Sequence, residues 1–219
     1  MSYGVIKGMK FNKTLIKLLP TIGIGIFILL SIYAATLYPG GSQVDSNTLG
    51  FDWRNNFWCN LTSAKGLNGV DNPARPIAIL AMIILCSSMI IFFFLFAEFF
   101  EKNKTWNVLI KLAGVISMVC AVFIFTSYHD VMTTILSIFG VLGIVCIIRA
   151  LYMSKMTFFM ISGIICMILI GLNNYFYYDD ALIYYLPVLQ KINFVLILSW
   201  TIGLNLIIMR GAEKHRSTL

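Results

Sequence analysis

The chain has 219 residues, of which 59% are hydrophobic and only 11% are charged. A soluble domain needs far more ionic side chains on its surface, so this composition excludes a soluble globular protein. The formal net charge of +7 arises from basic residues placed around apolar stretches. We interpret it as a topology signal with some attraction to anionic lipid, and we expect no nucleic-acid partner.

Six long apolar stretches organise the chain. Crossing the hydrocarbon core takes roughly 20 helical residues, with about 17 as a practical minimum, and each stretch is long enough. A helix satisfies its own backbone polar groups in lipid. We therefore predict an all-α integral membrane bundle that forms a single domain over residues 1–219. Its predicted spans cover 18–38, 76–98, 109–129, 131–151, 156–176 and 187–209. The first stretch exceeds the apolar core of a signal peptide, about 7–15 residues, and is interpreted as a retained helix.

Basic residues are sorted to alternate ends of these stretches. Twelve of the sixteen Lys and Arg residues fall on one side, and all six Asp residues fall on the other. Basic residues in short loops mark the cytoplasmic face, which predicts that both termini are cytoplasmic. The short termini favour a bacterial host and the cell (inner) membrane. The basic residues on the predicted cytoplasmic side are Lys7, Lys10, Lys13, Lys17, Lys102, Lys104, Lys111, Arg149, Lys155, Arg210, Lys214 and Arg216.

The first outer connection, 39–75, is the only long one and is too aromatic for a random linker. Asp52 precedes a segment in which Trp53, Phe57 and Leu61 recur at helical spacing. This predicts a short helix capped by Asp52 that lies on the membrane surface. A structural lid over the mouth of the bundle is the alternative. Cys59 is the only cysteine in an outer loop, so no intrachain disulfide is expected there.

A histidine next to a carboxylate, His129-Asp130, lies at the turn between the third and fourth stretches. The pair is consistent with a general base or a mixed metal site. Adjacent residues do not face each other on a helix, so each is expected to use other partners. Asp130 is expected to cap the fourth helix, and Asp179 and Asp180 are expected to cap the segment that follows them. His129 is the only histidine outside the tail, which excludes a multi-histidine metal site.

On the cytoplasmic side, charged residues follow the second stretch. Glu98, Glu101, Lys102 and Lys104 are typical of a solvated turn, and we assign them no chemistry. Trp200 in the sixth stretch is expected to face other helices. No charged residue lies near the middle of any span, which disfavours ion pumping and proton relay.

The outer motifs carry a resemblance. Pro39-Gly40-Gly41 leaves the first stretch, Asn56-Phe57-Trp58-Cys59-Asn60-Leu61 follows, and Phe123 and Phe125 precede His129. In these features the chain resembles uncharacterised bacterial six-helix membrane proteins akin to the DRAM/Frag/Sfk-like families. Cys59 stands where those proteins have Ser, and Asn60 stands where they have an acidic residue, departures that count against an acid–base role for this segment. The resemblance implies six helices, a site near the non-cytoplasmic face and a role in lipid remodelling or organisation.

These features support three hypotheses. The first is a non-enzymatic protein that binds membrane lipid or a small amphiphile at its outer mouth. The second is a lipid hydrolase or transferase in which His129 is the base, Asp130 or Asp52 orients it, and Cys59 is a less favoured nucleophile. The third and least supported is a small transporter, because no broken charged helix or inverted repeat is evident. No cofactor or metal is identified. The candidate ligand-binding residues are Arg54, Asn56, Cys59, Asn60, Arg75 and Asn173.

Overall fold

The computed structural model describes residues 13–216, and side chains within 15–211. The basic residues predicted at Lys7 and Lys10, and the side chains of Lys13, Lys214 and Arg216, lie outside these ranges. Six α-helices form the described chain, and all six are long and apolar enough to cross a membrane, which confirms the predicted all-α class. They are α1 (Lys13–Leu37), α2 (Arg75–Phe100), α3 (Lys104–Val122), α4 (His129–Met153), α5 (Thr157–Tyr177) and α6 (Leu186–Arg216).

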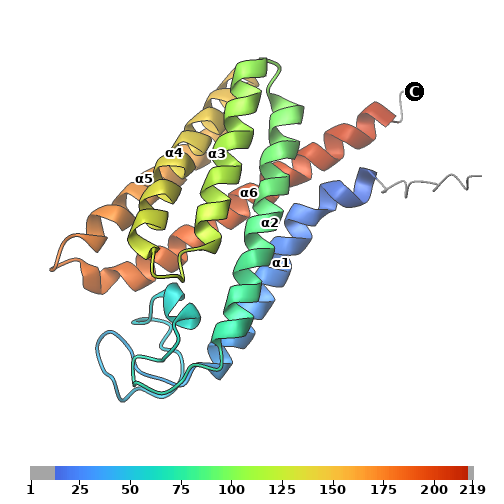
Figure 1. The fold of residues 1–219 in the computed structure, drawn as a ribbon. Coiled ribbons are helices and arrows are strands. Elements are labelled where there is room, and N and C mark those ends of the chain that lie inside the picture. Colours follow the sequence, from blue (N-terminus) through green and yellow to red (C-terminus); the bar gives the residue numbers. More distant parts are fainter. Residues whose placement is uncertain (1–12, 217–219) are drawn as a thin grey trace, which may run out of the picture.

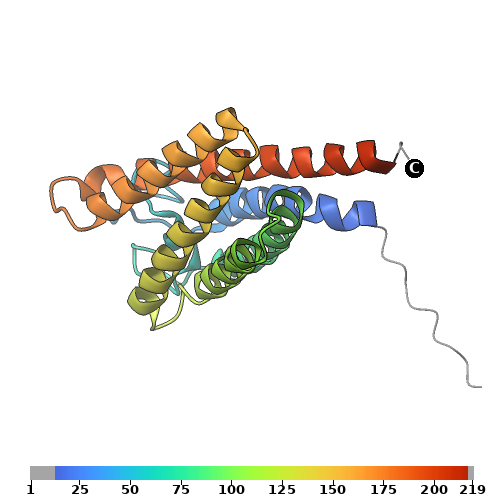
Figure 2. The same cartoon turned by 90° about the horizontal axis from the view of Figure 1, so that it is seen from above.

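Each helix packs against its neighbour in the sequence, and α6 returns to pack against α1 and α2 (Figure 1). The start of α1 and the end of α6 lie at the same end of the bundle, as Figure 2 also shows. We call this the terminal end; it also carries the connections 101–103 and 154–156. The opposite end, the loop end, carries the connections 38–74, 123–128 and 178–185.

The core is centred on α2. Phe92 and Phe96 are almost fully buried, and together with Phe93 they meet side chains of α4 and α6, among them Leu151 and Leu204. Phe96 continues the aromatic contact to Phe100, with ring centroids 4.7 Å apart. Such rings bury a large area each, so α2 holds the other helices around it.

Small residues allow some of the helices to approach one another closely. A Cβ added to Gly114 would lie 2.2 Å from Cγ of Phe93, and one added to Gly23 would lie 1.7 Å from Oγ of Ser88. Gly140, by contrast, has no neighbouring atom within 4 Å of that position. Close contacts of this kind join α2 to α1 and α3, and also α5 to α6, where a Cβ on Gly163 or Gly203 would lie 2.8 Å from the ring of Trp200 or Phe159.

The third helix ends earlier than predicted. It stops at Val122 rather than near residue 129, because the chain turns repeatedly between 123 and 129. The Oγ1 of Thr126 donates to the carbonyl oxygen of Phe123 over 2.7 Å, an alternative to continued helical bonding. Trp200 faces the bundle as expected, since its Nε1 donates to the carbonyl oxygen of Phe159 on α5 over 2.9 Å.

Candidate functional site

The long connection 38–74 is an ordered loop that folds over one side of the loop end (Figure 1). It leaves α1 through Gly40 and Gly41, whose φ angles of 125° and 81° are accessible mainly to glycine. A Cβ on Gly41 would lie 2.3 Å from the backbone N of Asn68, so the segment that leaves α1 packs directly against the later part of the loop. The hydroxyl of Tyr38 accepts a hydrogen bond from the N–H of Leu67 at 3.0 Å and fixes the same crossing.

No surface helix forms in this loop, contrary to the prediction from Trp53, Phe57 and Leu61. Residues 53–56 make a single turn, and a short 3-10 helix, η1 (Trp58–Thr62), follows it. The turn does not continue as an α-helix because the Oδ1 of Asn60 accepts a hydrogen bond from the N–H of Phe57 at 2.7 Å. Leu61 is 1% exposed and Trp53 is 48% exposed, so the three residues do not share one face.

Three buried asparagines hold the loop together, and two of them are candidate ligand-binding residues. Asn56 is fully buried; its Oδ1 accepts the N–H of Asp52 at 2.8 Å and its Nδ2 donates to the carbonyl of Gly41 at 2.9 Å. The Nδ2 of Asn72 reaches the carbonyl oxygens of Asn60 and Leu61 at 3.3 and 3.1 Å. These amides satisfy backbone groups of the loop itself, so the structure gives Asn56 and Asn60 an architectural position.

Asp52 caps the turn that follows it. Its Oδ1 accepts the N–H groups of Arg54 and Asn55 at 2.9 and 3.1 Å, and its Oδ2 accepts the side chain of Asn55 at 2.7 Å. Partial burial acts to raise the pKa of Asp52, but these hydrogen bonds and the charge of Lys191 outweigh it and leave the pKa below its usual value.

Two neighbouring residues of α6 fasten the loop to the helix bundle. Lys191 donates from Nζ to the carbonyl oxygen of Asn56 at 2.7 Å, and the Oε1 of Gln190 accepts the N–H of Trp58 at 2.9 Å. The indole of Trp58 then stacks on Phe194, with ring centroids 5.7 Å apart. Sequence reasoning missed this anchor; a Gln-Lys pair at the start of a span is its only signal.

Beside this anchor lies an open cleft of about 760 Å³, bounded by the loop, the end of α5 and the start of α6. Its size falls within the roughly 300–1,000 Å³ typical of small-molecule sites. Arg54 and Asn55 line the cleft from the loop, and Tyr184 and Tyr185 line it from the connection between α5 and α6. The residues that line the cleft include Arg54, Asn55, Phe176, Tyr184, Val188 and Ile192. Val188 and Ile192 are 40% and 48% exposed, so other helices do not cover this apolar wall.

Arg54 brings the positive charge to this cleft. Within the described chain its guanidinium has no hydrogen-bond or ion-pair partner, and the cleft lining contains no carboxylate. The carboxylate of Asp179 accepts the N–H groups of Ala181 and Leu182 at 2.9 and 3.2 Å, which confirms its predicted role as a cap. In the described chain no such hydrogen bond is found for Asp180, contrary to the prediction that it caps the same segment.

The remaining candidates lie away from the cleft lining. His129 begins α4, and its Nδ1 lies 3.1 Å from the Oδ1 of Asp130, contrary to the expectation that the two would use other partners. Asp130 lies inside the first turn rather than before it, so the predicted cap is wrong; Tyr128 precedes the helix instead. Both side chains are open to solvent, at 42% and 94% exposure. In residues 13–216 no hydrogen bond or ion pair joins them to Asp52, and no metal-ligating group of three is found.

In the described part of the chain, no hydrogen bond joins Cys59, Arg75 or Asn173 to the His129–Asp130 pair. Cys59 is exposed as a residue, yet its thiol experiences enough burial to raise its pKa, which disfavours a nucleophilic thiolate. Arg75 begins α2 and holds a buried Nε, and Asn173 on α5 holds a buried Oδ1. Neither of these atoms has a hydrogen-bond partner in the described part of the chain.

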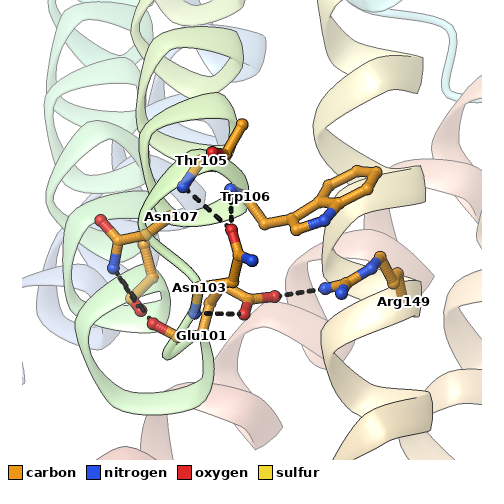
Figure 3. A network of polar contacts seen from close by, with 7 residues as sticks. Glu101, Asn103, Thr105, Trp106, Asn107 and Arg149 are labelled. Carbon is orange, nitrogen blue, oxygen red and sulfur yellow. Dashed lines mark hydrogen bonds and ion pairs between the residues drawn. The ribbon is translucent and has the colours of Figure 1, made fainter.

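The terminal end carries a polar network that the sequence did not reveal (Figure 3). Glu101 is not solvated as expected: its side chain is only 8% exposed, and its Oε2 accepts Nη1 of Arg149 at 2.6 Å. The guanidinium lies 4.3 Å from the ring centroid of Trp106, and the Oε1 of Glu101 accepts the N–H of Asn103 at 2.9 Å. This network joins the ends of α2, α3 and α4, and we assign it a structural role.

Comparison with protein-family models, with curated proteins and with solved structures finds no match for this chain. The resemblance to bacterial six-helix proteins therefore stays a prediction.

Proposed function

We propose that this chain binds a membrane amphiphile in the cleft between the loop, α5 and α6, and that the 38–74 loop forms the fixed roof of this site. The observation that carries the proposal is the composition of the cleft: a partly exposed apolar wall beside a polar rim with an unpaired guanidinium. An amphiphile presents the same two chemistries in the same order, an alkyl chain next to a polar head.

The proposal includes an orientation. The loop end faces away from the cytosol and the termini lie in it, with the chain in the inner membrane of a bacterial cell. Support comes from the charges: Lys102, Lys104, Arg149 and Lys155 all lie at the terminal end, where short basic loops mark the cytoplasmic face. In this orientation the cleft draws its ligand from the outer leaflet.

A matched pair of substitutions on one helix tests the site. Val188→Trp fills the cleft, while Val195→Trp adds the same side chain at a position of α6 that is 63% exposed and outside the cleft. We expect mass spectrometry of gently purified protein to detect a bound amphiphile in the wild type and in Val195→Trp, and to find it depleted in Val188→Trp. Absence of any retained amphiphile from the wild type, or equal depletion in both variants, would refute the proposal.

A lipid hydrolase or transferase is the second candidate, and one observation favours it. The 3.1 Å contact between His129 and Asp130 is the geometry in which a carboxylate orients a general base. The test is turnover of labelled phospholipid by purified protein. Release of fatty acid or headgroup that His129→Ala abolishes would support the enzyme; a wild type without turnover would reject it.

A further inference from the structure

The ligand class follows from the charge at the cleft, an inference that rests on the proposed function and specifies it. We infer that the site selects a phospholipid with a net negative headgroup, of the phosphatidylglycerol kind, and that Arg54 is the residue that recognises its charge.

The first argument is the state of the Arg54 side chain. Its backbone N–H is held by Oδ1 of Asp52 at 2.9 Å, so the residue is fixed at the rim, while its guanidinium is left without a partner among residues 13–216. A guanidinium offers five donors in a rigid fork that matches phosphate oxygens. A neighbouring loop residue, Asn55, adds a side-chain amide on the same side of the cleft.

The second argument is the separation of charge. Asp52, the acidic residue closest to Arg54 in sequence, accepts hydrogen bonds from N–H groups of its own turn and from the side chain of Asn55, and it is also near Lys191. Asp179 is similarly occupied by N–H groups of its own turn. Asp180, next to Ala181 of the lining, is exposed to water, which screens its charge. Because no carboxylate lines the cleft, the guanidinium of Arg54 is the formal charge on its lining, and it disfavours the ammonium group of a zwitterionic headgroup relative to an uncharged glycerol.

The third argument fixes the source of the anion. The apolar wall beside Arg54 includes Phe176, Val188 and Ile192, and the last two lie one turn apart on α6 and are 40% and 48% exposed. A free phosphate would leave this wall uncovered, whereas a lipid covers it with an acyl chain. The inference therefore commits to a bilayer lipid rather than to a soluble anion.

The test measures lipid binding to detergent-purified protein by native mass spectrometry, with dioleoyl phosphatidylglycerol and dioleoyl phosphatidylcholine as probes. The wild type is expected to bind the anionic lipid about tenfold more tightly, a difference of about 1.4 kcal/mol. Arg54→Gln should abolish this preference and still bind phosphatidylcholine, and Arg54→Lys should restore part of it. Lys65→Gln is the control, because it removes an exposed charge of the same loop outside the cleft and should keep the preference.

Each other outcome overturns the inference. Equal binding of both lipids by the wild type would reject charge selection while leaving the proposed function intact, and binding of neither would reject both. An equal loss of preference in Lys65→Gln and Arg54→Gln would indicate general surface charge. Displacement of phosphatidylglycerol by glycerol phosphate at matched concentration would indicate a soluble anion as the ligand.

Discussion

Replacing Asn56 with Ala should loosen the entire loop at the mouth of the bundle. The substitution removes the hydrogen bonds from the N–H of Asp52 and to the carbonyl oxygen of Gly41, at 2.8 and 2.9 Å, and a longer one to the Oδ1 of Asn60 at 3.4 Å. Losing each of the two short bonds costs about 1 kcal/mol net, rising to about 2 kcal/mol where the buried partner is left unpaired. Opening of the loop should therefore become easier by about 2–4 kcal/mol.

Hydrogen exchange in a detergent or nanodisc sample measures this opening. The N–H groups of Gly41 and Asn68 bond to backbone carbonyls across the loop, so they exchange only when it opens. Their exchange should accelerate about 30- to 700-fold in Asn56→Ala, since about 1.4 kcal/mol corresponds to a factor of ten. Asn47→Ala is the matched control: Asn47 is exposed in the same loop, and no hydrogen bond of its side chain is found in the described chain. Acceleration below threefold, or equal acceleration in the control, would refute the argument.

The other predictions concern charge and packing. The pKa of Asp52 in the folded protein lies below its ordinary value of 3.8. The carboxylate therefore contributes fully to loop stability above pH 3.8, and this contribution is lost as the pH falls through the lowered pKa of the folded state. Asp52→Asn should remove the acid-dependent part of the hydrogen-exchange profile. In a thermal unfolding assay, Glu101→Gln should destabilise the bundle by about 1–3 kcal/mol. This cost is lower than for a fully buried ion pair because the side chain of Arg149 is one-third exposed. Glu98→Gln is the control, because the side chain of Glu98 is 69% exposed, and it should cost about 0.5 kcal/mol or less in the same assay. Gly114→Ala should cost about 1–3 kcal/mol by forcing a Cβ into Phe93, whereas Gly140→Ala, with open space around it, should be neutral or slightly stabilising; equal effects in the two variants would contradict the packing described.

The helices could be predicted because their signal is local. Apolar length alone defines a span, and a carboxylate two residues before exposed N–H groups defines a cap, as at Asp179. Where a polar side chain competes with the backbone, the local signal was misleading. The side chain of Thr126 donates to a backbone carbonyl oxygen, and α3 ends early. The side chain of Asn60 accepts a backbone N–H, and the expected surface helix does not form.

The long-range contacts could not be read from the sequence. Glu101 and Arg149 are 48 residues apart, and Trp58 and Gln190 are 132 residues apart, so both contacts depend on which helix ends meet. Asn55 and Asn56 are adjacent and chemically identical, yet Asn55 lines the cleft and Asn56 is fully buried. The sequence identifies Arg54 only as a candidate ligand-binding residue, and the structure adds the apolar wall beside it.

The orientation of the bundle decides which leaflet supplies the ligand, and cysteine labelling in intact cells measures it directly. In a Cys59→Ser background, Asn47→Cys places a thiol on the exposed surface of the loop, and Lys102→Cys places one on the exposed turn at the terminal end. A membrane-impermeant maleimide should label Asn47→Cys in intact spheroplasts, and Lys102→Cys only after the membrane is opened. Labelling of the turn but not of the loop, or of both positions before opening, would contradict the account.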